Sequence, residues 1–124
     1  MICRRLFLFL EKKVMNINLL SANPEDLEDL VPDSGYSLVS NQILREGKEI
    51  GFMYRDRPEE KEDSGWRFLS GEEEQEYLDD ESNSRYIGLN AVANIDRSII
   101  PLLKSRIGSE FEKIDGAWHP VASH

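Results

Sequence analysis

Residues that commonly build catalytic and metal sites are scarce in this chain. Its 124 residues include one cysteine, Cys3, and two histidines, His119 and His124, both near the C-terminal end. A single cysteine excludes an intrachain disulfide, which fits a reducing cytoplasm. Nucleophilic catalysis needs a nucleophile beside a base, and zinc sites need clustered Cys or His ligands. We therefore expect a cytoplasmic protein that is not an enzyme and carries no metal or cofactor.

Long apolar runs are also missing. The longest, Leu6–Leu10, has five residues and is followed by charged residues. A secretory signal needs about 7–15 apolar residues and a membrane-spanning helix about 20, so we expect neither. Residues 1–14 are interpreted as an N-terminal extension that precedes an alternative start at Met15. An ordinary strand or helix packed on the domain is an equal alternative for this stretch.

The negative charge of the chain is concentrated in one window. Asp56–Glu81 contains twelve Asp and Glu against three Lys and Arg, which accounts for the whole net charge of −9. Such acidity argues against binding nucleic acid or anionic membranes and favours a basic protein partner. A solvated face that keeps the protein soluble is the alternative. The predicted partner-binding residues are Glu72, Glu73, Glu76, Asp79 and Asp80, with Tyr77 as an aromatic anchor. We expect Glu73 and Glu76 to be exposed.

Alternating apolar residues predict several short strands. The predicted strands are Tyr36–Ser40, Glu49–Arg55, Trp66–Leu69, Phe111–Ile114 and Ala117–Val121, with Tyr86–Leu89 either a strand or the start of a helix. The first two are expected to form a hairpin around Glu46-Gly47, and Asp115-Gly116 favours a type I′ turn between the last two.

Capping residues predict short helices. The predicted helices begin at Asn23-Pro24 and run to Val31, begin at Ser70 with Glu73 completing a capping box, cover Asn90–Ile95, and begin at Ser98 with Pro101 in the first turn. We therefore expect one α+β domain over residues 20–121, a small antiparallel sheet with two to four short helices. The predicted core consists of Phe52, Trp66, Phe68, Ile100, Leu103 and Phe111.

The many acids allow two other interpretations. Paired carboxylates in a cleft would suit a small hydrolase or a sugar-binding domain, which is the alternative function. Asp79, Glu81 and Asn83 have the spacing of a calcium loop. That loop needs Gly at its sixth position and Glu at its twelfth, where this chain has Ser84 and Asn90, so a capped turn is favoured.

Two separated motifs resemble a known bacterial family. They are GFMYRDRPEEKEDSGWRFLSGEEEQEYLDD and NAVANIDRSIIPLL, followed by IGSEFEK. The chain resembles, from about Tyr36 to Lys113, a domain of unknown function similar to immunity protein 33 of polymorphic toxin systems. The most specific pieces are Asp63-Ser64-Gly65-Trp66-Arg67-Phe68, Ser70-Gly71-Glu72, Asn94-Ile95-Asp96 and Ile100-Pro101-Leu102-Leu103. The resemblance implies a small intracellular binding protein that neutralises a toxin domain.

Overall fold

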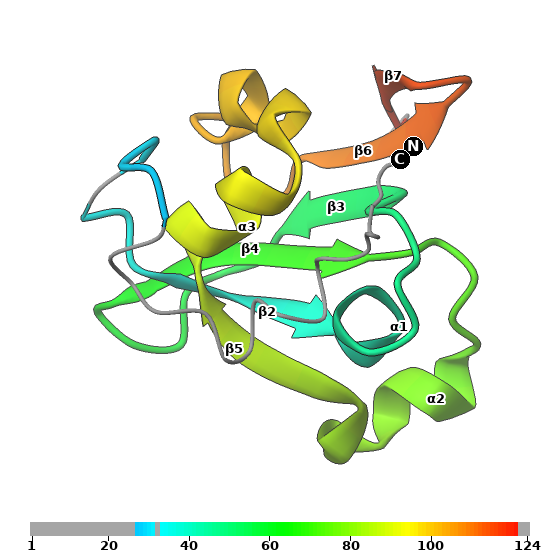
Figure 1. Ribbon diagram of the computed structural model, residues 1–124. Helices are drawn as coiled ribbons and strands as arrows, with labels where there is room; N and C mark the ends of the chain where they lie inside the picture. Colours follow the sequence, from blue (N-terminus) through cyan, green and yellow to red (C-terminus); the bar gives the residue numbers. More distant parts are fainter. Residues whose placement is uncertain (1–26, 32, 122–124) are drawn as a thin grey trace.

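The computed structural model of the chain describes residues 27–31 and 33–121, which form one mixed sheet with short helices around it (Figure 1). The strands in these ranges are β2 (Tyr36–Ser40), β3 (Phe52–Arg55), β4 (Asp63–Leu69), β5 (Ser84–Gly88), β6 (Glu110–Ile114) and β7 (Ala117–Pro120). The α-helices are α1 (Asn41–Leu44), α2 (Gln75–Asp79) and α3 (Leu89–Ile95), and the 3-10 helices are η3 (Glu81–Asn83) and η4 (Arg97–Leu102). Within the described ranges no helix is long and apolar enough to cross a membrane.

The sheet order is β5-β2-β4-β3-β6-β7, and β2 pairs with β4 in parallel. The other neighbouring pairs are antiparallel. The predicted all-antiparallel sheet is therefore wrong for one pair, and so is the hairpin between β2 and β3. The Ser40 side chain accepts a hydrogen bond from the Gln42 N–H and begins α1, so the chain leaves the sheet after β2. The chain re-enters the sheet as β3, two positions from β2, and β4 then lies between these two strands.

The core lies around the buried strand β4. Trp66 and Phe68 are fully buried, as predicted, whereas Ile100, Leu103 and Phe111 are half-buried and pack against the cluster. The fully buried apolar residues also include Val39, Ile43, Leu44, Ile50, Met53, Val92, Ala93 and Ile99.

Phe52 was predicted in the core but is only half-buried, and its ring lies 6.0 Å from that of Tyr54. The buried residue of β3 is Met53. Ile50 precedes β3 and is not part of its alternation. Counting every second residue from Ile50 therefore puts Phe52 on the buried face of the strand, where Met53 lies instead.

Local capping and turn predictions met mixed outcomes. Asp115 and Gly116 have φ values of 51° and 81°, the two positive angles that a type I′ turn requires, so the β6–β7 hairpin is confirmed. The cap of η4 is Asp96, which accepts from the Ser98 N–H, and not Ser98 itself. Residues 27–31 are not helical, and the rest of that predicted helix lies outside the described residues, as does the predicted extension 1–14.

Candidate partner-binding surface

Strand β4 divides the acidic window into two surfaces. Residues 56–62 hold four carboxylates and two basic side chains, whereas residues 70–83 hold seven carboxylates and no Lys or Arg. Between them, Asp63 and Arg67 form a buried ion pair. Figure 1 shows the 56–62 loop at the start of β4 and α2 beyond its far end. Seven strand residues span roughly 23 Å, so the window is not one patch. We call residues 70–83 the acidic segment.

Glu73 organises the beginning of the acidic segment. Its two carboxylate oxygens accept the N–H groups of Ser70 and Gly71, at 2.8 and 3.0 Å. Burial raises the pKa of Glu73, but hydrogen bonds from the Ser40 hydroxyl and from these amides outweigh it and hold the pKa below its ordinary value. The side chain is half-buried, so the expectation that it is exposed is wrong.

The predicted capping box does not begin a helix. The Ser70 hydroxyl donates to the Gln42 side chain at 2.6 Å and accepts the Glu72 N–H at 3.1 Å, so it is engaged in a turn. The helix α2 begins later, at Gln75, with Glu74 at its N-cap position. The Glu73-to-Ser70 half of the box is present and fixes the turn ahead of the helix.

The carboxylates of α2 and η3 face solvent. Glu76, Asp79 and Asp80 are all exposed. Asp79 accepts a hydrogen bond from the Gln75 side chain at 2.8 Å. Asp80 caps η3 by accepting the Ser82 hydroxyl and N–H, and these two bonds lower the pKa of its carboxyl. Short local bonds thus hold two of the predicted partner-binding acids in place.

Tyr77 lies among these acids with its ring half-buried. Burial raises the pKa of its hydroxyl, and the nearby charges of Glu46 and Glu73 raise it further. The side chain borders a shallow depression of about 470 Å³. The depression is lined by Gln42, Glu72, Glu74, Glu76 and Tyr77. The structure therefore brings three of the six predicted residues, Glu72, Glu76 and Tyr77, to one hollow.

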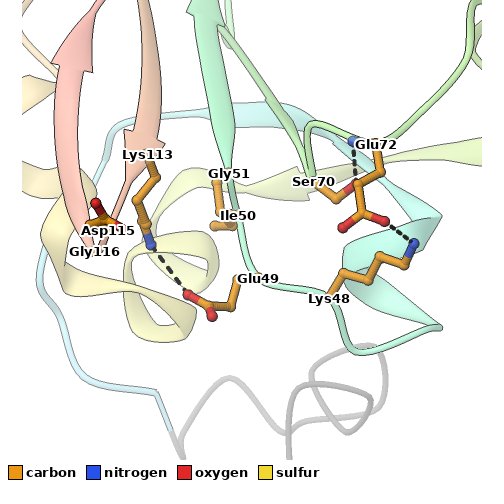
Figure 2. Close-up of a pocket in the computed structure, with 9 residues that line it drawn as sticks. All are labelled: Lys48, Glu49, Ile50, Gly51, Ser70, Glu72, Lys113, Asp115 and Gly116. Carbon is orange, nitrogen blue, oxygen red and sulfur yellow. Dashed lines mark hydrogen bonds and ion pairs between the residues drawn. The ribbon is translucent and has the colours of Figure 1, made fainter.

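A second cavity of about 360 Å³ lies beside the acidic segment (Figure 2). On one side of this cavity the Lys48 ammonium pairs with Glu72 at 2.9 Å, and the hydrogen bond that it donates to Glu72 raises the pKa of Lys48. On the other side Lys113 lies 3.8 Å from Glu49. Lys48 therefore offsets part of the Glu72 charge. Lys48 is not among the predicted site residues, because it follows Glu46-Gly47, the predicted turn of a hairpin that the structure does not form.

The described carboxyl groups give little support to acid–base chemistry. A general acid at neutral pH needs a raised pKa, whereas the carboxyls with clearly shifted pKa values, Asp63, Glu73 and Asp80, are all shifted downward. In residues 27–31 and 33–121, no three His, Cys, Asp or Glu side chains are grouped so that they could hold a metal ion. Of the three residues with the spacing of a calcium loop, Asn83 donates a hydrogen bond from its side-chain amide to the Tyr77 carbonyl.

Most of the chain matches a known protein family. A sequence profile of the immunity protein Imm33 domain matches residues 37–122, which is most of the chain and includes the acidic segment. This confirms the resemblance noted from the motifs. Searches of curated proteins and of solved structures found no match.

Proposed function

Because the chain belongs to the Imm33 family of immunity proteins, we propose that it binds and neutralises a basic toxin domain in the cytoplasm, as a binding protein and not an enzyme. The contact surface is the acidic segment. The observation that carries this proposal is its composition, with seven carboxylates and no Lys or Arg over residues 70–83.

Complementary charge is a physical reason for such a surface. A field of one sign steers an oppositely charged partner and raises the association rate. Toxins that act on nucleic acids need basic surfaces to hold phosphates, and an acidic protein can occupy those surfaces. The exposed carboxylates of Glu74, Glu76 and Asp79 have no basic partner among the interactions of the described residues.

Tyr77 supplies the anchor that charge alone lacks. Binding energy at protein interfaces concentrates in a few aromatic or arginine side chains surrounded by weaker contacts. In the depression, the Tyr77 ring lies among Glu72, Glu74 and Glu76. A Lys or Arg side chain of the toxin that enters this hollow would meet a carboxylate and an aromatic ring together. The partner chemistry that fits best is therefore a cationic side chain.

The segment is also held in shape before binding. Glu73 fixes the Ser70-Gly71 turn, Asp80 caps η3, and the Asn83 amide donates to the Tyr77 carbonyl at 2.9 Å. A preorganised surface loses less conformational entropy on binding, which favours affinity.

Charge reversal tests the proposal once the toxin is identified from the neighbouring gene or by pull-down. Cells that express the toxin with the Glu74→Lys/Glu76→Lys variant should lose protection, and the purified pair should bind at least about tenfold more weakly. The control is Glu59→Lys/Glu62→Lys, which makes the same change of charge on the other acidic surface. Full protection by the first variant, or equal losses in both, would contradict this site.

A further inference from the structure

Residues 28–31 run along α3 and are held there through their main chain. The Asn94 side chain bonds both main-chain groups of Glu28: its amide donates to the carbonyl at 3.0 Å and its oxygen accepts the N–H at 3.1 Å. The Asn90 oxygen accepts the N–H groups of Leu30 and Val31 at 2.8 and 2.9 Å, and its amide donates to the Glu28 carbonyl at 2.8 Å. Asn90 and Asn94 are four residues apart, so they share one face of the helix.

The side chains of residues 28–31 add further contacts that restrict which segment can bind there. The Glu28 carboxylate pairs with Arg97 at the surface. Leu30 and Val31 are half-buried and pack against the core. Val31 borders a cavity of about 310 Å³ whose lining includes Trp66. Asn90 and Asn94 of α3 and Arg97 of η4, which we call the α3 face, thus bind three main-chain N–H groups, one carbonyl and a carboxylate. The core beside them contacts the two aliphatic side chains. Recognition through main-chain bonds, with side-chain contacts for specificity, is how many domains bind extended peptides.

The family profile covers the α3 face but not residues 28–31, which bind to it. The α3 face lies within the Imm33 match, which begins at residue 37, whereas residues 28–31 precede it. The bonds between Asn94 and Glu28 are exposed, and so are both side chains of the Arg97–Glu28 pair, at 59% and 65%. Exposed contacts of this kind contribute little to stability. The bonds from the Leu30 and Val31 N–H groups to Asn90 are part-buried, so a segment that replaces residues 28–31 must supply the same main-chain donors.

We propose that the α3 face is a second polypeptide-binding site, which residues 28–31 occupy in the free protein and which an extended acidic segment of a partner polypeptide takes in their place. The partner segment carries a carboxylate followed, two and three residues later, by aliphatic side chains. Figure 1 shows α3 over the sheet and α2 beyond the end of β4, so the two binding surfaces are separate. The inference therefore does not depend on the role of the acidic segment.

The test uses the full chain and a blocked synthetic peptide, Leu-Glu-Asp-Leu-Val, which copies residues 27–31. The observed signals are the side-chain amide resonances of Asn90 and Asn94 during titration. They should shift as peptide is added. The Leu30→Gly/Val31→Gly variant should respond at a peptide concentration about tenfold lower. Residues 28–31 compete with the peptide at an effective concentration in the mM range, and the two substitutions weaken that competition.

The control changes the peptide and not the protein. Methylation of the peptide nitrogens that correspond to Leu30 and Val31 removes only the two donors that Asn90 accepts. This peptide should bind at least about tenfold more weakly, because the part-buried Asn90 oxygen loses both of its donors. Absence of any shift in both proteins, or equal shifts with both peptides, would show that residues 28–31 are only an internal tether.

Discussion

Arg67 and Asp63 form two parallel hydrogen bonds, Nη1 to Oδ1 and Nη2 to Oδ2, each 2.9 Å long. Their side chains are only 5% and 1% exposed. Asp63 also accepts the N–H groups of Gly65 and Glu59, which leaves its carboxylate fully bonded. The run from Asp63 to Phe68, the most specific piece of the family resemblance, is therefore a structural unit of β4. It shapes the strand that separates the two acidic surfaces.

Removing one partner of this pair should strongly destabilise the fold. Asp63→Ala leaves the Arg67 charge buried and unpaired, and we expect the free energy of unfolding to fall by about 3–5 kcal/mol. Urea denaturation measures the loss. The matched control is Asp63→Leu with Arg67→Met, which removes both charges and should recover a large part of it. If Asp63→Ala costs less than about 1 kcal/mol, the pair is not buried as described.

The same pair should make stability depend on pH. The hydrogen bonds from Arg67 hold the pKa of Asp63 far below its usual range, although burial opposes them. The unfolded chain then binds more protons than the folded one below about pH 4, so stability falls as the pH drops through that value. The Asp63→Asn variant, which cannot titrate there, should show a shallower decline between about pH 4 and pH 2. Parallel curves for the two proteins would contradict this assignment.

Gly65 should not tolerate a side chain. Its φ of +87° is unfavourable for other residues, and an added Cβ would lie 2.3 Å from the Asp56 carbonyl oxygen. Gly65→Ala should therefore cost more than about 2 kcal/mol in unfolding free energy. Gly88→Ala is the control, because its φ is −53° and nothing lies within 4 Å of an added Cβ. Equal stability of the two variants would show that the backbone of β4 at Gly65 relaxes.

Glu73 and Glu76 should behave differently although both are acids of the same segment. Glu73→Ala removes two bonds to main-chain amides, so we expect a loss of about 1–2 kcal/mol. Glu76 is exposed with no such bonds, and Glu76→Ala should change stability by less than about 0.5 kcal/mol. Thermal and urea unfolding compare them. A larger loss of stability for Glu76→Ala than for Glu73→Ala would show that Glu73 has no structural role. Charge reversal at Glu73 would then test binding without disturbing the fold.

Features with local causes were predictable from the sequence. Tyr36–Ser40 forms a strand because its own residues favour extended backbone. Asp115-Gly116 forms a type I′ turn because both residues tolerate positive φ. The acidic side chains around Tyr77 were likewise visible in the sequence, since α2 and the turn before it keep neighbours in the chain close in space.

Features that depend on distant partners were not predictable in this way. The choice of β4 as the neighbour of β2 depends on β4 being buried along most of its length. The Lys48–Glu72 pair and the contacts of Asn90 with residues 30 and 31 join segments more than twenty positions apart. No local pattern of residues signals such contacts.

The most direct test of the central claim is the association rate with the cognate toxin, measured by stopped flow over a range of ionic strength. The account predicts a rate that falls steeply with salt, since screening acts over about 8 Å at physiological ionic strength. Glu74→Lys/Glu76→Lys should lower the rate at least about tenfold at low salt and flatten its salt dependence, whereas Glu59→Lys/Glu62→Lys should change both much less. An unchanged rate and slope in the first variant would show that the acidic segment is a solvated face and that the toxin binds elsewhere.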